Sequence, residues 1–327
     1  MVLPVPVFNA LDAIGNTPVV RLHSVVPTGH ADVFLKLENL NPTGSYKDRM
    51  AKSIIEEAEL RGDLRRGMTV VEATCGSTGS SLAFVCAVKG YKLRAVSSDA
   101  FAVTKLRTMT AFGATVDLIE SSSRQTTADL MPRLMKHAKD IAQREDCYLA
   151  DQFNNPDVFT GYAKLGQELL EQFPRGIDGF CGAVGAGGMV MGVAKMMKPR
   201  LPKLRVLVLE PASAPTITQG RDGTHTVEGI GLGFVPPLLD RELYEEARSI
   251  HESEARTMCR RLAKEEGLLV GISTGMNVVA AIQMAKELGP GKTVVTIACD
   301  TGLKYMNGDL HDDGYSLFQC ERASGKM

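Results

Sequence analysis

Lys47 is the residue of this 327-residue chain whose surroundings best suit a nucleophilic amine. It lies in the turn-rich segment NPTGSYKDR of residues 41–49, directly before apolar residues at helical spacing. Most lysines are solvated surface charges, so the residue type alone predicts nothing. A lysine held at a helix start in a closed pocket, however, has a lowered pKa and can attack a carbonyl carbon. Lys47 is therefore a candidate covalent ligand, provided that other segments complete a pocket.

A glycine-rich segment at residues 182–189 follows an apolar strand pattern and opens a helical pattern. Small residues there leave backbone N–H groups free to surround an anion, and the positive end of the helix favours a phosphate. The segment GAVGAGGM at residues 182–189 is therefore expected to bind a phosphate.

A dinucleotide-binding fold is the competing interpretation of this segment, and it would make the protein an oxidoreductase. Glu210, at the end of the next strand pattern, could serve as the ribose-binding acid after Gly185 and Gly187. Val190 stands where the third glycine of the fingerprint belongs, and this interpretation leaves Lys47 without a role. Binding of NADH by the protein would support the dinucleotide-binding interpretation.

A second cluster of glycines and hydroxyls, TCGSTG at residues 74–79, also follows a strand pattern and precedes a helical one. Its hydroxyls and exposed N–H groups suit a small carboxylate, although serine and threonine are also ordinary helix N-caps. The residues expected to contact the carboxylate are Thr74, Cys75, Gly76, Ser77 and Thr78. A reactive lysine, a phosphate site and a carboxylate site together are what a pyridoxal phosphate enzyme requires.

Strand and helix patterns alternate along the chain, which predicts an α/β fold with parallel sheets. The predicted strands are residues 33–37, 69–71, 93–96, 115–119, 179–184, 204–209 and 293–298. The predicted helices are residues 47–61, 80–89, 105–112, 128–145, 160–172, 189–198, 255–266 and 276–288. A polar, turn-rich stretch at residues 151–157 is the expected crossover between two domains. The smaller domain is predicted at residues 41–150, and the larger at 1–40 plus 151–327.

Composition excludes several classes of protein. With 37 basic and 38 acidic side chains the net charge is -1, whereas a nucleic-acid binder is usually basic. No apolar run approaches a membrane span, and no signal peptide is evident, so we expect a cytoplasmic protein. The seven cysteines and six histidines show no metal-ligand spacing, so no metal is predicted.

Motifs in order through nearly the whole chain resemble the cysteine synthase and cystathionine β-synthase family of fold type II pyridoxal phosphate enzymes. Besides those above, they are IGNTPVVRL at 14–22, KLEN at 36–39, QFNNP at 152–156, GIGLGFVP at 229–236, GISTG at 271–275 and DTG at 300–302. The resemblance implies two open twisted α/β domains of the tryptophan synthase β type, with the cofactor between them. It also implies a homodimer.

The resemblance assigns roles to single residues. The residues that would hold the cofactor phosphate are Gly185, Ala186, Gly187, Gly188 and Met189. Lys47 is expected to form a Schiff base with pyridoxal 5'-phosphate and to move the substrate α-proton. Gln152 would join residues 74–78 around the substrate carboxylate, and Gly229 and Ser273 would line the pocket. Thr301 would face the pyridine nitrogen, with the neighbouring Asp300 as the alternative partner.

Three residues depart from the family pattern. Ser77 stands where an asparagine that contacts the cofactor hydroxyl is usual, and Met189 replaces a phosphate-loop threonine. Cys75 replaces a serine, and a thiol at a helix start is expected to have a lowered pKa and to be sensitive to oxidation. Such changes are also compatible with a degenerate, regulatory homologue, but the intact Lys47 favours an enzyme.

The implied reaction is β-replacement on an O-activated L-serine, with sulfide or a related nucleophile, giving L-cysteine or a β-substituted alanine. The segment around Gly223, Glu228 and Gly229 resembles synthases that use O-acetylserine. O-phosphoserine is an alternative donor, because Arg221 lies near this segment in sequence and could bind the phosphate dianion. Elimination, as in a cysteine desulfhydrase or a serine dehydratase, is the other alternative. The expected partners are a small amino-acid substrate and a small nucleophile.

Overall fold

Two sheets organise the chain in the computed structural model, which describes residues 6–121, 127, 129–144 and 146–311. Every strand of the smaller sheet comes from residues 41–150, and every strand of the larger one lies outside that range. The predicted α/β fold class is confirmed. The domain limits at residues 41 and 150 stay a prediction.

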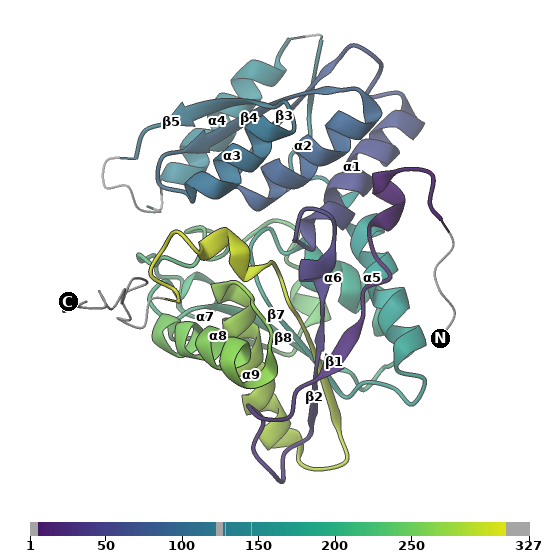
Figure 1. Ribbon diagram of the computed structural model, residues 1–327, viewed down its shortest axis with the longest axis vertical. Helices are drawn as coiled ribbons and strands as arrows, with labels where there is room; N and C mark the ends of the chain where they lie inside the picture. Colours follow the sequence, from purple (N-terminus) through teal and green to yellow (C-terminus); the bar gives the residue numbers. More distant parts are fainter. Residues whose placement is uncertain (1–5, 122–126, 128, 145, 312–327) are drawn as a thin grey trace, which may run out of the picture.

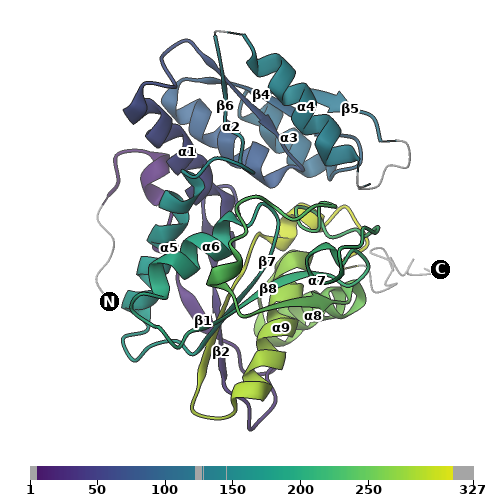
Figure 2. The same ribbon diagram turned by 180° about the vertical axis from the view of Figure 1, so that it is seen from behind.

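The smaller sheet has four parallel strands in the order β5-β4-β3-β6. They are β3 (Thr69–Ala73), β4 (Lys92–Ser98), β5 (Thr115–Ile119) and β6 (Cys147–Leu149). Helices α2 (Ser77–Lys89) and α3 (Val103–Ala111) cover one face, and α4 (Leu130–Ala142) covers the other (Figures 1 and 2). The carboxyl end of β3 therefore leads into α2 at the edge that faces the larger sheet.

The larger sheet has six strands in the order β1-β2-β10-β7-β8-β9, of which only β1 runs antiparallel to its neighbour. They are β1 (Val19–Arg21), β2 (Asp32–Lys36), β7 (Gly179–Ala183), β8 (Arg205–Pro211), β9 (Glu246–Ile250) and β10 (Thr293–Ile297). Side chains alternate between two cores, so Phe180 packs with α5 (Val158–Gln172) and α6 (Gly188–Met197). Cys181 packs on the opposite face with α8 (Glu252–Glu266) and α9 (Ile272–Leu288).

Helix α1 (Lys47–Arg61) lies between the two sheets and packs on both α2 and α5. Its buried apolar residues recur at helical spacing, for example Met50, Ile54 and Ala58. The helix ends at Gly62, whose φ of 79° is favourable for glycine. The first residue of this helix is Lys47, so the packing of α1 fixes the position of the candidate nucleophile.

A buried ionic cluster attaches the start of α1 to the larger sheet. Arg49 donates from Nε to Glu38 at 2.6 Å and from Nη1 to Glu168 at 2.7 Å. Lys36, at the end of β2, donates to Glu168 at 2.6 Å. Burial opposes the charge of Glu168, but its bonds with Arg49 and Lys36 outweigh burial and lower its pKa to about 2. Each carboxylate and each cation of the cluster therefore has a charged partner.

The predicted elements are confirmed with shifts of a few residues at their ends. Helix α2 begins at Ser77 and α9 at Ile272, three and four residues earlier than the sequence predicts, because glycine-rich loops already have helical geometry. The predicted helix at 128–145 is observed at Leu130–Ala142, and residues 128 and 145 lie outside the described residues. Short elements were not predicted, namely β1, β6, β9, α7 (Thr216–Gln219) and the 3-10 helices at Ala10–Ala13, Glu38–Leu40, Arg241–Leu243 and Gly302–Tyr305.

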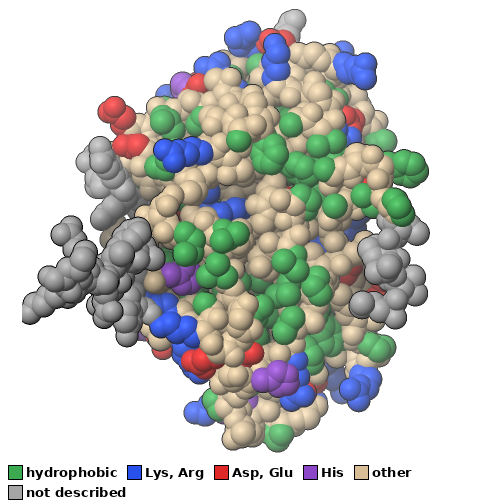
Figure 3. All heavy atoms as spheres, in the orientation of Figure 1, with side chains coloured by type: hydrophobic (Ala, Val, Ile, Leu, Met, Phe, Trp, Pro, Cys, Tyr) green, Lys and Arg blue, Asp and Glu red, His purple; other side chains and the backbone are tan. Residues whose placement is uncertain are grey.

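Surface features of the described residues are those of a mixed-charge protein. Figure 3 shows acidic and basic side chains mixed at the rim of one face, with hydrophobic side chains scattered over the helices. In the part of the chain that the structure covers, none of the helices combines the length and apolar character needed to cross a bilayer.

Candidate active site

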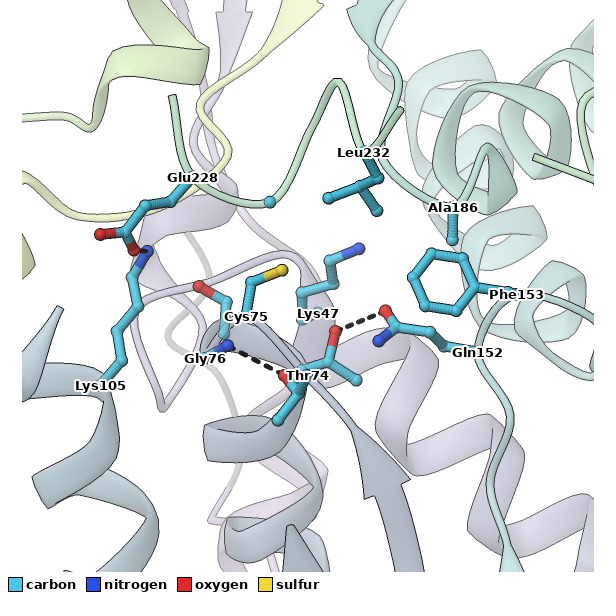
Figure 4. Close-up of a pocket in the computed structure, with 13 residues that line it drawn as sticks. Lys47, Thr74, Cys75, Gly76, Lys105, Gln152, Phe153, Ala186, Glu228 and Leu232 are labelled. Carbon is cyan, nitrogen blue, oxygen red and sulfur yellow. Dashed lines mark hydrogen bonds and ion pairs between the residues drawn. The ribbon is translucent and has the colours of Figure 1, made fainter. Parts of the chain in front are cut away.

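Lys47 is buried, with 9% of its surface exposed, and its amine points into a cavity between the two sheets (Figure 4). Nζ lies 4.7 Å from the ring centre of Tyr46. No acceptor among the described residues forms a hydrogen bond with it. Burial disfavours the charged amine and lowers its pKa from 10.5 to about 8. A large share of this amine is therefore unprotonated at slightly alkaline pH, as a nucleophile and base require.

The predicted phosphate loop lies on one side of Lys47. Residues 185–190 line a small cavity together with Lys47 and Tyr46. Helix α6 begins here at Gly188, after Gly187 with a φ of 83°, and within the described chain the amides of residues 188–190 bond to no acceptor. A Cβ on Gly185 would lie 2.3 Å from the carbonyl oxygen of Gly229, so this approach of two backbones requires glycine. Free amides at a helix start make an anion site.

The predicted carboxylate loop lies on another side, between β3 and α2. Thr74 folds this loop, because its Oγ1 accepts hydrogen bonds from the amides of Gly76 at 2.9 Å and Gly79 at 3.0 Å. Cys75, Gly76, Ser77 and Thr78 line the cavity of Lys47 with Thr74. The site residues predicted in this loop are thus brought together with Lys47.

Gln152 reaches the carboxylate loop from the segment between β6 and α5. Thr78 donates from Oγ1 to the amide oxygen of Gln152 at 2.7 Å. The amide nitrogen of Gln152 donates instead to the carbonyl of Ala73 and to Glu72, each at 3.1 Å. The side chain of Gln152 therefore orients Thr78, and its amino group faces away from Thr78.

Glu72 supports Gln152 without lining either cavity of Lys47, and the sequence did not predict this role. It is 1% exposed, and it accepts hydrogen bonds from both the backbone and the side-chain amide of Gln152. Burial raises its pKa to about 8. Its position just after the predicted strand at residues 69–71 and two residues before Thr74 was the available signal.

Cys75 corrects one prediction. Its thiol was expected to have a lowered pKa, but burial, reinforced by the charge of Glu228, raises the pKa to about 12. Sγ points into the cavity near Lys47 and lies 3.4 Å from Sδ of Met131 (Figure 4). The desolvation of the thiolate outweighs the effect of the helix start, so the thiol stays protonated at neutral pH.

A buried ion pair between Lys105 and Glu228 closes the cavity on the side away from Gln152 (Figure 4). Nζ of Lys105 lies 2.5 Å from Glu228, and the two side chains are 3% and 17% exposed. The stem of Lys105 lies against Gly76, where a Cβ would approach its Cδ to 2.6 Å. Glu228 precedes a predicted pocket residue in sequence, whereas nothing in the sequence signals Lys105.

The remaining predicted residues occupy different places. Gly229 lines the cavity of Lys47. Ser273 is buried near the start of α9, beside the thiol of Cys299, and lines neither cavity of Lys47. Thr301 also lines neither, and its hydroxyl accepts from the amide of Leu303 at 3.3 Å. Asp300 accepts from Tyr305 at 2.8 Å, and its second oxygen is buried with no hydrogen-bond partner among the residues that the structure describes.

These residues fit pyridoxal phosphate. The loop before α6 offers free amides and a backbone approach that only glycine permits, which suits the phosphate. Lys47 offers an amine of lowered pKa next to that loop, which suits the aldehyde. The role of Thr301 toward the ring nitrogen stays a prediction.

Comparisons with known proteins agree with this fit. The family "Pyridoxal-phosphate dependent enzyme" matches residues 10–300. A cysteine synthase of Staphylococcus aureus (strain N315) is 41% identical over 308 residues, which cover 94% of this chain and 97% of the relative. O-ureido-L-serine synthase of Streptomyces lavendulae is 35% identical over 310 residues, 94% of each chain. The solved structure of O-acetyl serine sulfhydrylase isoform 3 from Entamoeba histolytica has a TM-score of 0.87 and 31% identity, over 95% of this chain and 94% of that one.

Proposed function

Because the chain belongs to the pyridoxal-phosphate dependent enzyme family, as a cysteine synthase-like member, we propose that it catalyses β-replacement on O-acetyl-L-serine. The product would be L-cysteine or another β-substituted alanine, depending on the nucleophile. The observation that carries this proposal is the position of the Lys47 amine between the loop before α6 and the loop of residues 74–78. An amino-acid substrate joined to the cofactor needs both sites at once.

When bound, pyridoxal phosphate withdraws electrons from the substrate α-carbon. The amides of residues 188–190 would hold its phosphate, and the amides of the carboxylate loop would orient the substrate carboxylate. Lys47 Nζ, whose pKa is lowered to about 8, would take the α-proton. Phe153 and Leu232 complete the cavity wall and keep water from the reacting atoms.

The donor is proposed to be O-acetylserine because Lys105, the other cation on the cavity wall of Lys47 in the described chain, is already paired with Glu228. Neither cavity of Lys47 is lined by an arginine of the described chain. Arg221 is exposed and donates to Gln219 rather than toward the site. The Entamoeba relative is named for O-acetyl serine, which supports the same donor. The homodimer and the cytoplasmic location stay predictions that rest on the resemblance and the sequence.

An absorbance spectrum of the purified holoenzyme tests the proposal. We expect the visible cofactor band to shift when O-acetylserine is added alone and to return when a nucleophile is added, with a β-substituted alanine released. A band that ignores O-acetylserine would refute this donor and direct the search to O-phosphoserine, serine or cysteine. Release of pyruvate and ammonia without incorporation of a nucleophile would establish elimination instead.

A further inference from the structure

The ion pair of Lys105 and Glu228 is held from several elements. Glu228 accepts from the backbone amide of Ala102 at 3.1 Å through its other oxygen. Lys105 also donates to the hydroxyl of Tyr305 at 3.2 Å, and its amine lies 4.8 Å from the ring centre of that residue. The pair therefore has a fixed geometry and lies on the wall of the catalytic cavity.

Transfer of two charges from water into the protein interior costs free energy, and the attraction between the charges offsets only part of that cost. An apolar pair of similar size often stabilises a fold equally well. Several neighbouring wall positions are apolar, namely Phe153, Ala186 and Leu232, so an apolar pair would also suit this wall. A ligand that carries charges of its own would explain why this wall is ionic.

The pair lies on the side of Lys47 that the donor does not need. In Figure 4 the carboxylate loop stands between Lys105 and Gln152, with Cys75 and Lys47 in the middle. The donor carboxylate is expected between that loop and Lys47. The side of Glu228 is thus free for the second substrate, the nucleophile.

The charges favour one class of nucleophile. Besides burial, Glu228 raises the pKa of Cys75 while Lys105 and Lys47 lower it, so charges of both signs act on a sulfur atom inside the cavity. The anion HS⁻ has a single charge, so it could pair with the cation Lys105 but would leave the carboxylate of Glu228 without a partner. A zwitterion adds one positive and one negative charge, so both members of the pair keep a partner and no net charge is buried.

A second cavity gives such a ligand room beside the pair. It is lined by Glu228, Thr104, Thr226, Arg256 and Lys304, among others, and has a volume of about 360 Å³. That volume lies within the range of about 300–1,000 Å³ typical of small-molecule sites. Its walls come from both sides of the catalytic cleft, and Glu228 belongs to both cavities.

We infer that the nucleophile is an amino acid, whose carboxylate binds Lys105 and whose ammonium group binds Glu228. This inference rests on the proposed function. In that reaction the bond between the donor β-carbon and its oxygen breaks and acetate leaves. The side-chain sulfur or nitrogen of the amino acid forms the new bond to the β-carbon and gives up a proton. Lys105 and Glu228 are binding residues for this second substrate.

A set of matched thiols tests the inference with the wild-type holoenzyme and O-acetylserine. L-cysteine carries both charges, cysteamine lacks the carboxylate, 3-mercaptopropionate lacks the ammonium group, and sulfide lacks both. We expect kcat/KM for L-cysteine, measured as thioether by mass spectrometry, to exceed the other values about tenfold or more. Equal or faster use of sulfide or of either truncated thiol would overturn the inference.

Variants assign the preference to the pair. Lys105→Met should abolish the advantage of L-cysteine over cysteamine, and Glu228→Gln its advantage over 3-mercaptopropionate. The double variant leaves neither charge of the pair unpartnered, and it should lose the advantage of L-cysteine over both cysteamine and 3-mercaptopropionate. Lys89→Met, which removes a lysine paired with Glu59 at 2.7 Å outside both cavities, should keep the wild-type preference. A preference unchanged in the double variant would overturn the assignment.

The donor half-reaction separates the two proposals. If O-acetylserine alone shifts the cofactor band but L-cysteine has no advantage, only the inference about the nucleophile fails. If O-acetylserine alone leaves the band unchanged, the proposed function fails and the inference fails with it.

Discussion

The lowered pKa of Lys47 predicts how fast the cofactor-free protein captures pyridoxal phosphate at each pH. Burial of the amine lowers its pKa from 10.5 to about 8. At pH 7 an amine of pKa 8 is about 10% neutral, whereas an ordinary lysine amine is only about 0.03% neutral. Because only the neutral amine attacks an aldehyde, Lys47 should react about 300-fold faster than an ordinary lysine at this pH, for equal access.

The shape of the pH profile follows from the same shift. The capture rate should rise about tenfold per pH unit below pH 8 and level off above it, because the amine is then mostly neutral. The capture rate of an ordinary lysine amine continues to rise until the pH reaches the pKa of that amine. The plateau therefore distinguishes a buried Lys47 from an exposed one.

Capture is measured by mixing cofactor-free protein with pyridoxal phosphate between pH 6 and pH 10 and quenching with borohydride. Mass spectrometry of the Lys47 peptide gives the rate of labelling, with free Nα-acetyl-lysine as the reference amine. A labelling rate that still rises in parallel with the reference amine between pH 9 and pH 10 would refute the buried, low-pKa amine.

Two further changes have defined outcomes. Gly185→Ala should weaken retention of pyridoxal phosphate about tenfold or more, because its Cβ would lie 2.3 Å from the carbonyl oxygen of Gly229. Gly308→Ala, whose Cβ would lie 3.5 Å from the nearest atom, is the control, and equal retention by both variants in dialysis would contradict the close approach. Glu168→Gln should lower the free energy of unfolding at pH 7 by about 2 kcal/mol. Because the pKa of Glu168 is lowered to about 2, the difference should persist above pH 4.5 and vanish toward pH 2 in urea titrations, and a pH-independent difference would contradict the charge effect.

Most of the fold was predictable because the strands and helices have clear local patterns. The strand that became β7 and the helix that became α1 were bounded almost as observed, since burial on both faces and helical spacing leave strong local signals. Strands β1 and β6 were missed because each has only three residues, and β9 was missed because its sequence EARSI has few of the β-branched and apolar residues typical of a strand.

The candidate site was predictable where its residues lie in loops before helices. Lys47 and the two loops share this location, and the parallel sheets bring such loops together. The pair of Lys105 and Glu228 was not predictable, because two residues so far apart in sequence give no local signal of contact. The pKa of Cys75 was predicted wrongly, because the sequence shows the helix start but not how deeply the thiol is buried.

The ionic cluster at the start of α1 has a consequence for evolutionary change in this protein. Arg49 is shared by Glu38 and Glu168, and Glu168 is shared by Arg49 and Lys36. Losing any one member leaves a buried charge without its partner, so a first substitution is harmful even when the corresponding double or triple substitution is tolerated. The members are therefore expected to change only together across descendants of this sequence. The segment that carries Lys47 should therefore accumulate substitutions more slowly than the catalytic role of Lys47 alone would require.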